Sequence, residues 1–351
     1  MNPTYTITTT LLKYLTAITS AREIIEQSHV LPQREATLRR QALLKNTHSS
    51  TAIEGNQLNF EQVTSLADGK SVAATHKDKQ EVLNYLATLE KIPELIVNHT
   101  FTVETLLTIH RMVASDVLPS SADSGTFRTV QVFVGRSVFM GTHIHQEVDY
   151  MPPQSQEIPA LVDEFITWLN NKSTWEIHPV LLAGIAHYEI ARIHPFIDGN
   201  GRTARLFATL ILYVSSFDKR RLFALDDFYD HDRQAYYNAL KTVDKETLNI
   251  TQWLEYFCEG VLSAVEAVKN VVEKTGVQSK NNNKPQIMLN HRQMQIVEFI
   301  VKNGKASNKD FQVLFNLSAQ SVHKELKTLI DAGIVAPKGL GRAAHYILVD
   351  D

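Results

Sequence analysis

Cysteine is almost absent from this sequence. Its 351 residues include one, Cys258, which excludes an internal disulfide and fits a reducing compartment such as the cytoplasm. The burial tendency of cysteine favours a core position for this residue over a reactive one. We therefore expect a cytoplasmic protein whose stability does not depend on disulfide bonds.

Long hydrophobic runs are also missing. The most apolar stretch, residues 206–217, is shorter than the roughly 20 residues that a membrane-spanning helix needs, and Arg205 and Asp218 bound it. Residues 1–27 lack the basic start and the cleavage-site pattern of a secretory signal. We therefore expect no membrane segment, and we interpret residues 206–217 as a buried helix.

Neither sign of charge dominates. The sequence has 35 Lys and Arg against 38 Asp and Glu, so no strong overall field attracts it to nucleic acid or to a membrane surface. Hydrophobic residues make up 44% of the sequence, and a chain of this length can fill the cores of two or three domains. Any charged functional site must therefore be local.

Strand-forming patterns are rare, whereas apolar residues recur at helical intervals along most of the chain. Alternating β-branched residues in 127–134, with turns at Gly135 and Gly141, predict a single hairpin in the first part of the chain. The sequence thus predicts a mainly α fold with a β-hairpin. Helices are expected as two segments within 8–46, then at 50–54, after Asn59, and at 78–118, 156–170, 178–192, 202–216, 232–241 and 251–274.

The C-terminal part has the pattern of a separate module. Residues 275–286 are polar, contain consecutive Asn residues and lack periodicity, which is typical of a linker. Three helical segments and two short strands follow, which is the order of a winged helix-turn-helix domain. We predict a helical N-terminal region at 1–95, a central domain at 96–274, this linker, and a winged-helix domain at 287–351.

The strongest local signal is HPFIDGNGRTAR at residues 194–205, between two apolar helical segments. Its glycines let backbone N–H groups approach a ligand, and the helix that begins there directs its unpaired N–H groups and the positive end of its dipole to the same point. Arg202 and Arg205 lie on one face of that helix and can bind successive phosphates. The candidates for phosphate binding are Gly199, Asn200, Gly201, Arg202, Thr203 and Arg205.

Two further residues of this segment supply reaction chemistry. Asp198 offers the hard oxygen ligand that magnesium uses together with phosphate oxygens and water. His194 titrates near neutral pH and can remove a proton from a hydroxyl that attacks phosphorus. Each residue alone also has a structural explanation, but their combination in one short segment favours a site for phosphoryl-type transfer.

The segment resembles the HxFx(D/E)GNGRxxR signature of the Fic (filamentation induced by cAMP) family without a gap, and the similarity extends over roughly residues 80–270. The resemblance implies a protein adenylyltransferase, which moves AMP from ATP to a Ser, Thr or Tyr hydroxyl of a target protein with Mg²⁺. It also implies a role for each matching residue: His194 as the base, Asp198 as the magnesium ligand, Gly199 to Gly201 as the hole for the α- and β-phosphates, and Arg202 and Arg205 as clamps for the outer phosphates.

The same resemblance adds residues outside the signature. Tyr237, beside Tyr236, is similar to the residue that lines the family's adenine pocket, and Val134 and Gly135 are weaker candidates for nucleotide contact. Family members often carry Asn where this chain has Asp244, which leaves recognition of the ribose or the adenine open.

The predicted hairpin, at 130–145, resembles the family's flap, which binds the backbone of a target protein as an added strand. Because backbone capture does not depend on the sequence of the target, one scaffold can serve several targets. His143 and His145 lie on this hairpin without a Cys or carboxylate nearby in the sequence to complete a metal site, so we interpret them as part of a solvated face.

Residues 50–55, STAIEG, resemble the (S/T)xxxE(G/N) motif on the inhibitory helix of many Fic proteins. Alone this short pattern also fits a capped surface helix, but together with the downstream signature it favours an inhibitory role for Ser50 and Glu54. A Glu54 carboxylate paired with Arg205 would keep that arginine from the γ-phosphate, and ATP would bind in a pose unsuited to transfer. We therefore expect an autoinhibited enzyme.

Alternatives stay open at this point. The same carboxylate can orient a water molecule for removal of AMP from a modified protein, and the transferred group can be another part of a nucleotide. In another functional class, the chain is a winged-helix DNA-binding regulator. Residues 290–351 hold eight Lys or Arg against six Asp or Glu, well short of a dense basic surface, so protein contact or a homodimer explains the C-terminal module at least as well as DNA binding. Self-modification is a further expectation.

Overall fold

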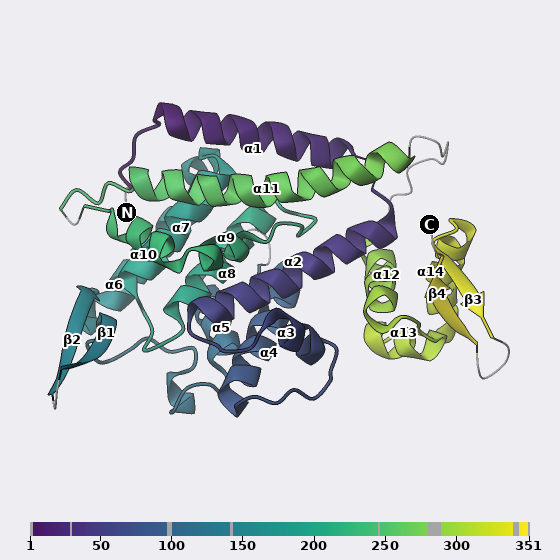
Figure 1. Cartoon of the computed structure of the whole chain (residues 1–351), viewed down its shortest axis with the longest axis horizontal. Helices are drawn as coiled ribbons and strands as arrows, with labels where there is room; N and C mark the ends of the chain where they lie inside the picture. Colours follow the sequence, from purple (N-terminus) through teal and green to yellow (C-terminus); the bar gives the residue numbers. More distant parts are fainter. Residues whose placement is uncertain are drawn as a thin grey trace. The chain divides into compact units, whose positions relative to one another are not determined.

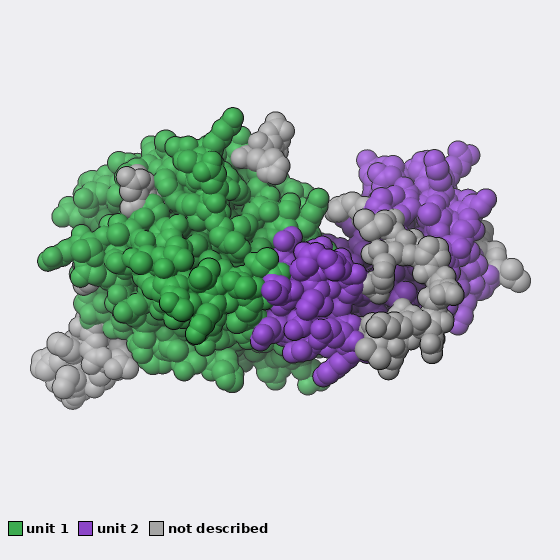
Figure 2. Space-filling model, turned by 90° about the horizontal axis from the view of Figure 1, so that it is seen from above, with its two compact units in different colours: residues 1–19, 43–264 green, residues 20–42, 265–351 purple. Residues whose placement is uncertain are grey.

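A computed structural model of the chain describes residues 3–28, 30–96, 100–140, 143–244, 246–279, 289–339 and 344–349. Within them helices predominate, and the strands form two small antiparallel pairs (Figure 1). The predicted mainly α fold with a hairpin is therefore confirmed. The chain divides into two compact units, one of residues 1–19 and 43–264 and the other of residues 20–42 and 265–351 (Figure 2).

Most of the chain up to residue 279 is helical. The α-helices are α1 (Thr9–Gln27), α2 (Pro32–Ile53), α3 (Phe60–Ala67), α4 (His76–Lys91), α5 (Val103–Ala114), α6 (Ile158–Leu169), α7 (Pro179–Ile193), α8 (Asn200–Val214), α9 (Leu225–His231), α10 (Arg233–Lys241) and α11 (Thr251–Ser279). Short 3-10 helices lie at Ile92–Glu94, Ser121–Asp123, Ser155–Glu157 and Lys172–Glu176.

Helix α2 differs from the prediction at its C-terminal end. It continues without a break to Ile53, so the separate short helix predicted at 50–54 is wrong. A hydroxyl of this region bonds back along the same helix instead of starting a new one, since Thr51 Oγ1 donates to Thr47 O at 2.9 Å. Gly55 follows with a φ of +93°, a left-handed conformation that ends the helix.

Helices α7 and α8 pack against each other in the core of the first unit. Both are buried along most of their length, and Leu206 and Phe207 are fully buried, as predicted for residues 206–217. Trp253 of α11 packs beside them and donates from Nε1 to Gly184 O at 2.8 Å. Within the described residues, no helix is both long and apolar enough to cross a membrane. The packing of α7 against α8 fixes both ends of the loop that joins them.

The predicted hairpin is present. Strand β1 (Val134–Met140) pairs antiparallel with β2 (His143–Tyr150), with Val134 opposite Tyr150 and a register shift between Val134 and Gly135. The side chains of residues 136–147 lie outside the described part of the chain, and so does the interpretation of His143 and His145.

The first strand begins later than predicted, at Val134 instead of residue 127. The reason is that Arg128 is fastened to the loop between α7 and α8. Its backbone N–H donates to Pro195 O, and its side-chain Nε donates to His194 O, both at 2.9 Å. The segment before the hairpin therefore supports the loop and does not extend the sheet.

The second unit contains the C-terminal elements α12 (His291–Asn303), α13 (Asn308–Phe315), α14 (Ala319–Asp331), β3 (Val335–Lys338) and β4 (His345–Leu348), with β3 and β4 antiparallel. Their buried core includes Phe311 and Leu326, together with Ala36 of α2. Three helices followed by two strands is the expected order of elements, while a winged-helix identity and DNA binding stay predictions.

The predicted linker begins inside a helix. Helix α11 continues to Ser279, whereas we expected it to end at residue 274. The remainder of the predicted linker, residues 280–286, lies outside the described residues.

Candidate active site

The loop between α7 and α8 turns sharply at both ends. His194 ends α7 at a φ of +50°, a left-handed conformation that is uncommon for residues other than glycine. Gly199 starts α8 at a φ of +78°, and a β-carbon at this position would lie 3.4 Å from His110 Nε2. Backbone strain in a residue with a side chain is typical of functional sites, and here it falls on the predicted base.

Asn200 holds the loop in shape from within. Its Oδ1 accepts from Phe196 N at 2.9 Å, and its Nδ2 donates to Phe196 O at 2.8 Å. Phe196 is fully buried and anchors the loop in the core. The side chain of Asn200 is therefore committed to the loop, and only its backbone N–H is left for the predicted contact with a phosphate.

His110 of α5 supports the same loop and was not predicted. It stacks on Phe196 with ring centroids 3.7 Å apart and an interplanar angle of 1°. Gly125 N donates to its Nδ1 at 3.0 Å, so the proton is on Nε2, which donates to Asp198 O at 2.9 Å. Burial lowers the pKa of His110 to about 4, so this ring is neutral near pH 7.

His194 has one defined ring contact. Its Nδ1 lies 3.3 Å from Ala191 O, and because a carbonyl only accepts, Nδ1 carries the proton. The other ring nitrogen, Nε2, then holds a lone pair. Burial lowers the pKa of His194, while the bond to Ala191 and the Glu54 carboxylate act in the opposite direction. A neutral ring with an available Nε2 is the form that a general base requires.

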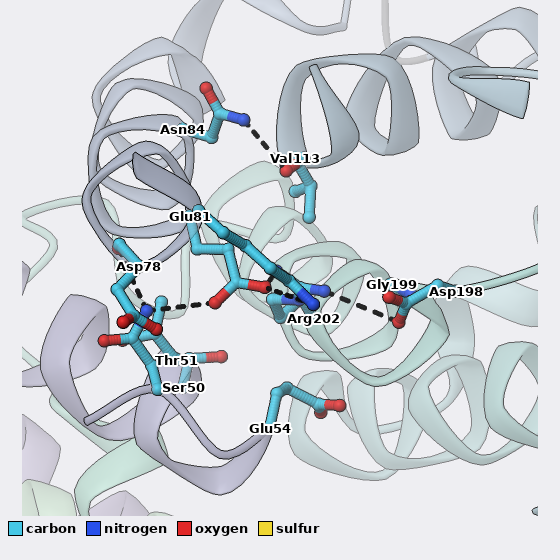
Figure 3. A network of polar contacts seen from close by, with 12 residues as sticks. Ser50, Thr51, Glu54, Asp78, Glu81, Asn84, Val113, Asp198, Gly199 and Arg202 are labelled. Atoms are coloured by element: carbon cyan, nitrogen blue, oxygen red, sulfur yellow. Dashed lines mark hydrogen bonds and ion pairs between the residues drawn. The ribbon is translucent and has the colours of Figure 1, made fainter. Parts of the chain in front are cut away.

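Arg202 is buried and lies between two carboxylates (Figure 3). Its Nη1 is 3.0 Å from Glu81 Oε1, and its Nη2 is 3.5 Å from Asp198 Oδ1. Even so, Nε and Nη1 have no hydrogen-bond partner of good geometry, and the buried Thr203 Oγ1 has none either. Buried donors without acceptors are uncommon, and an anion at this point would satisfy them.

Arg205 is completely buried and bound by polar groups at the C-terminal end of α2 and just after it. Its Nε donates to Ser50 Oγ at 2.6 Å, and its Nη2 donates to Ser50 O at 3.0 Å and to Glu54 Oε1 at 2.7 Å. The arginine side chain is 0% exposed, and that of Glu54 is 24% exposed. Burial alone would lower the pKa of Arg205, but the Glu54 carboxylate raises it well above its usual value. The predicted pair therefore exists, and water reaches it from the glutamate side.

The absence of a side chain at Gly201 leaves room for this pair. A β-carbon on Gly201 would lie 2.3 Å from Glu54 Oε1 and 3.2 Å from Arg205 Nη1. The Glu54 carboxylate thus lies directly over the first turn of α8, where the sequence predicts a phosphate.

Asp198 is the exposed acid of the loop, with 48% of its side chain accessible. Within the described residues, no group of three or more His, Cys, Asp or Glu side chains is arranged to hold a metal ion. A magnesium ion bound at Asp198 would therefore take its other ligands from a nucleotide and from water.

The two tyrosines of α10 have different surroundings. Tyr236 is 2% exposed. Its hydroxyl oxygen lies 2.9 Å from His187 Nε2 and accepts a hydrogen bond from Arg205 Nη1 at 3.5 Å. Tyr237 is half-buried and donates to Ile53 O, at the end of α2, at 3.2 Å. In this conformation Tyr236 supports Arg205 from the core and is not open to a nucleotide. Tyr237 is the more accessible of the two predicted contacts.

Behind Arg205 lies a second acid, also outside the prediction. Asp226 is 2% exposed, and its Oδ2 accepts from Tyr85 Oη at 2.6 Å. Burial raises the pKa of Asp226, and the charge of Arg205 opposes that shift. Asp226 is therefore a buried counter-charge for Arg205 that does not depend on Glu54.

The remaining predicted contacts lie at the base of the hairpin. Val134 is half-buried and Gly135 is exposed, at the start of β1. No described contact links either of them to the loop, so their proposed part in nucleotide binding rests on the resemblance alone.

Comparisons with known proteins identify the region that contains the loop. Residues 100–212 match the model of the Fic/DOC family. A relative from Culex quinquefasciatus, named protein adenylyltransferase Fic, is 31% identical over 204 residues, which is 56% of this chain and 37% of that protein. One of the same name from Aedes aegypti is 34% identical over 186 residues, 51% of this chain and 34% of that protein. This chain thus spans less than two-fifths of the length of either relative.

Solved structures share the fold over a longer stretch. A Fic family protein from Desulfovibrio desulfuricans G20 has a TM-score of 0.63 and 24% identity, covering 100% of this chain and 99% of that one. Residues 134–508 of Fic-1 from C. elegans give a TM-score of 0.60 and 23% identity, covering 75% of this chain and 73% of that one. At these identities the likeness establishes the fold.

Proposed function

Because this chain belongs to the Fic/DOC family through its residues 100–212, we propose that it is a protein adenylyltransferase that moves AMP from ATP to a Ser, Thr or Tyr hydroxyl of a target protein. The observation that carries the proposal is the pair of arginines at the start of α8. One is buried with unmet donors, and the other is held by a removable carboxylate. Both features suit a polyphosphate.

The residues present fit ATP and magnesium. Arg202 has buried donors that lack acceptors, and the N–H groups at the start of α8 have no partners within the helix. Asp198 would hold the ion, which supplies neutralisation of phosphate charge when bound. In this proposal the backbone from Gly199 to Gly201 binds the α- and β-phosphates, and Arg205 binds the outermost one.

His194 is the proposed general base. Its Nε2 accepts the proton of the target hydroxyl as the hydroxyl oxygen bonds to the α-phosphorus. The bond from the α-phosphorus to the oxygen that bridges to the β-phosphate breaks, and pyrophosphate leaves. The neutral state of the ring and its fixed tautomer support this role.

Glu54 is the proposed inhibitor. Its carboxylate lies over Gly201 and occupies Arg205, so an outer phosphate and Glu54 compete for one guanidinium. Because in-line transfer depends on fine alignment, a shift of the α-phosphate of about 1 Å is enough to suppress the rate by about a hundredfold. The target is proposed to add its backbone to the hairpin at 130–145, in the cytoplasm, where ATP is supplied.

The test uses ATP labelled on the α-phosphorus or, separately, on the γ-phosphorus. Glu54→Gly, supplied with Mg²⁺, is expected to transfer α-label to itself, or to a target in added cell lysate, at least about ten times faster than wild type. Without lysate, and so without other kinases, it is expected to transfer no γ-label. The matched control is Glu61→Gly, which introduces the same change at an exposed acid in the first turn of α3. A folded Glu54→Gly protein without α-label, or with γ-label, would refute the proposal.

The reverse reaction is the second candidate, because Glu54 lies close enough to raise the pKa of His194 and can share a water molecule with it. Pre-labelled protein incubated with wild type distinguishes the two directions. Release of AMP by wild type but not by Glu54→Gly would favour removal over transfer.

A further inference from the structure

Glu81 is a buried acid of α4 that lies outside every motif of the sequence. Its side chain is 6% exposed, and its Oε1 is 3.0 Å from Arg202 Nη1. Its other oxygen, Oε2, accepts from Asn56 Nδ2 at 2.9 Å. Lys77, one turn earlier on α4, has its Nζ 4.0 Å from Oε1. Glu81 therefore has partners on both oxygens and little access to water.

Asn56 fixes Glu81 from the segment that follows the inhibitory glutamate. Its Nδ2 also donates to Asp78 O at 2.9 Å, and its Oδ1 accepts from Leu58 N at 3.1 Å. Figure 3 shows Glu81 reaching toward Arg202 from α4, with Asp198 on the far side of the arginine. The carboxylate of Glu81 is thus held in place independently of any ligand.

The two acids beside Arg202 differ in what a ligand can do to them. Asp198 is 48% exposed and, under the proposed function, turns to the magnesium ion. Arg202 then keeps one carboxylate, Glu81, which no nucleotide can reach. A guanidinium held by Glu81 at Nη1 directs its remaining donors away from Glu81. Here these donors are Nε, which has no partner, and Nη2, which Asp198 releases when it turns.

We propose that Glu81 is a positioning residue for AMP transfer, which orients Arg202 so that its free donors meet the phosphates of ATP. The inference rests on the proposed function, because it assigns Arg202 to the same nucleotide. Glu81 does not compete with ATP as Glu54 does, and its removal would lower activity instead of raising it.

The charge of Glu81 gives a signature that a purely structural role lacks. Glu81→Gln leaves Arg202 as an uncompensated cation, which attracts the triphosphate at least as strongly but holds it less well aligned. We therefore expect kcat to fall by about ten- to a hundredfold while KM for ATP stays the same or decreases. A structural loss that loosens the binding site would instead raise KM, and loss of folded protein is detected separately by circular dichroism.

The experiment measures transfer of α-label in the Glu54→Gly background, so that the inhibitory carboxylate does not mask the effect. Glu81→Gln is compared with Glu298→Gln, which removes the acid of a half-buried Arg–Glu pair, Arg39–Glu298, 2.9 Å long and in the other unit. The control is expected to match Glu54→Gly in both constants. Circular dichroism establishes that each variant is folded.

A second variant serves if Glu81→Gln does not fold. Asn56→Ala keeps both charges of the pair but frees one oxygen of Glu81, and kcat should fall by about threefold with KM unchanged. If the folded variant has an unchanged kcat, or if its KM rises by the same factor as its kcat falls, the positioning role is overturned.

If Glu54→Gly itself takes no label, the proposed function fails and the role of Glu81 fails with it. If it takes label and the Glu81 variants equal it, only the role of Glu81 fails.

Discussion

Two arginines one turn apart on α8 each hold a glutamate, and the two glutamates differ in their access to solvent. The Arg205–Glu54 pair is 2.7 Å long, and the Arg202–Glu81 pair is 3.0 Å long. Glu54 follows the last residue of α2 and is 24% exposed, whereas Glu81 lies in the middle of α4 and is 6% exposed. Both are arginine–carboxylate pairs, and the difference that bears on ligand binding is their access to solvent.

Access decides which pair a ligand can break. A phosphate that displaces Glu54 releases the carboxylate into water, where its charge is solvated. Displacing Glu81 would leave a carboxylate buried without its partner, at a cost of several kcal/mol. Arg205 also keeps Ser50 and the buried Asp226 when Glu54 leaves. The exposed pair is therefore suited to regulation, and the buried pair to fixing geometry.

The largest expected effect tests whether both pairs serve one reaction. In the Glu54→Gly background, His194→Ala should lower transfer of AMP by about 10²- to 10⁴-fold, because no other group on the loop has a free ring nitrogen to take the proton. Label transfer from α-labelled ATP measures the loss. His76→Ala, at an exposed histidine that begins α4, is the control and should have no effect. If transfer survives His194→Ala, the reaction that Glu54 inhibits does not take place at this site.

The second prediction compares the stabilities of the two pairs. Glu81→Ala should lower the free energy of unfolding by about 3–5 kcal/mol, because Arg202 is left buried with an incomplete set of partners. Glu54→Ala should cost only about 1 kcal/mol, since water enters beside Arg205. Urea unfolding followed by tryptophan fluorescence reports on the correct unit, because Trp168, Trp175 and Trp253 all belong to it.

Glu61→Ala, at an exposed acid of α3, is the control for that comparison and should change stability by no more than about 0.5 kcal/mol. Equal losses for Glu54→Ala and Glu81→Ala would remove the distinction between a displaceable and a permanent carboxylate.

The smallest expected effect concerns pH. His194 must be neutral to act as a base, and its pKa lies below the usual 6.5 because of burial, so the rate should be constant near pH 7–8 and fall as the pH drops through that pKa. Glu54 raises the pKa of His194, so its removal moves this acid limb to lower pH. At pH 6 the difference is about twofold or less. Glu81 has no comparable influence, and adding Glu81→Gln to Glu54→Gly should leave the limb in place.

Rates of label transfer between pH 5 and 8, each relative to its own plateau, provide the measurement. An acid limb that shifts with Glu81→Gln but not with Glu54→Gly would reverse the assignments of the two acids.

The parts of the site that the sequence predicted are those that one continuous segment specifies. Residues 194–205 carry their own geometry, because the glycines, the helix start and the spacing of the arginines are local features. The Asn59 and Gln62 capping box at the start of α3 was predictable for the same reason and is present. The Glu54–Arg205 pair joins segments that are distant in the sequence. It could be predicted only because a second motif resembled the family's inhibitory helix.

The supporting residues were not predictable in the same way. His110, Glu81 and Asp226 lie on helices where a polar residue ordinarily faces solvent, and only tertiary packing buries them. His110 packs against the loop, Glu81 against Arg202 of α8, and Asp226 against Tyr85 of α4. Nothing in the sequence near them marks a partner on α8 or in the loop. The start of β1 was misplaced for a related reason, because residues 127–133 have a strand-like pattern but Arg128 is bound to the loop.

The central claim is that an outer phosphate of ATP takes the place of Glu54 on Arg205 while Glu81 stays on Arg202. A crystal structure of Glu54→Gly with magnesium and a non-hydrolysable ATP analogue tests it most directly. The account predicts phosphates against the N–H groups of residues 199–201, Arg205 in contact with the outermost phosphate, and an unbroken Glu81–Arg202 pair. A nucleotide bound elsewhere, or an Arg205 side chain turned away from it, would contradict the account.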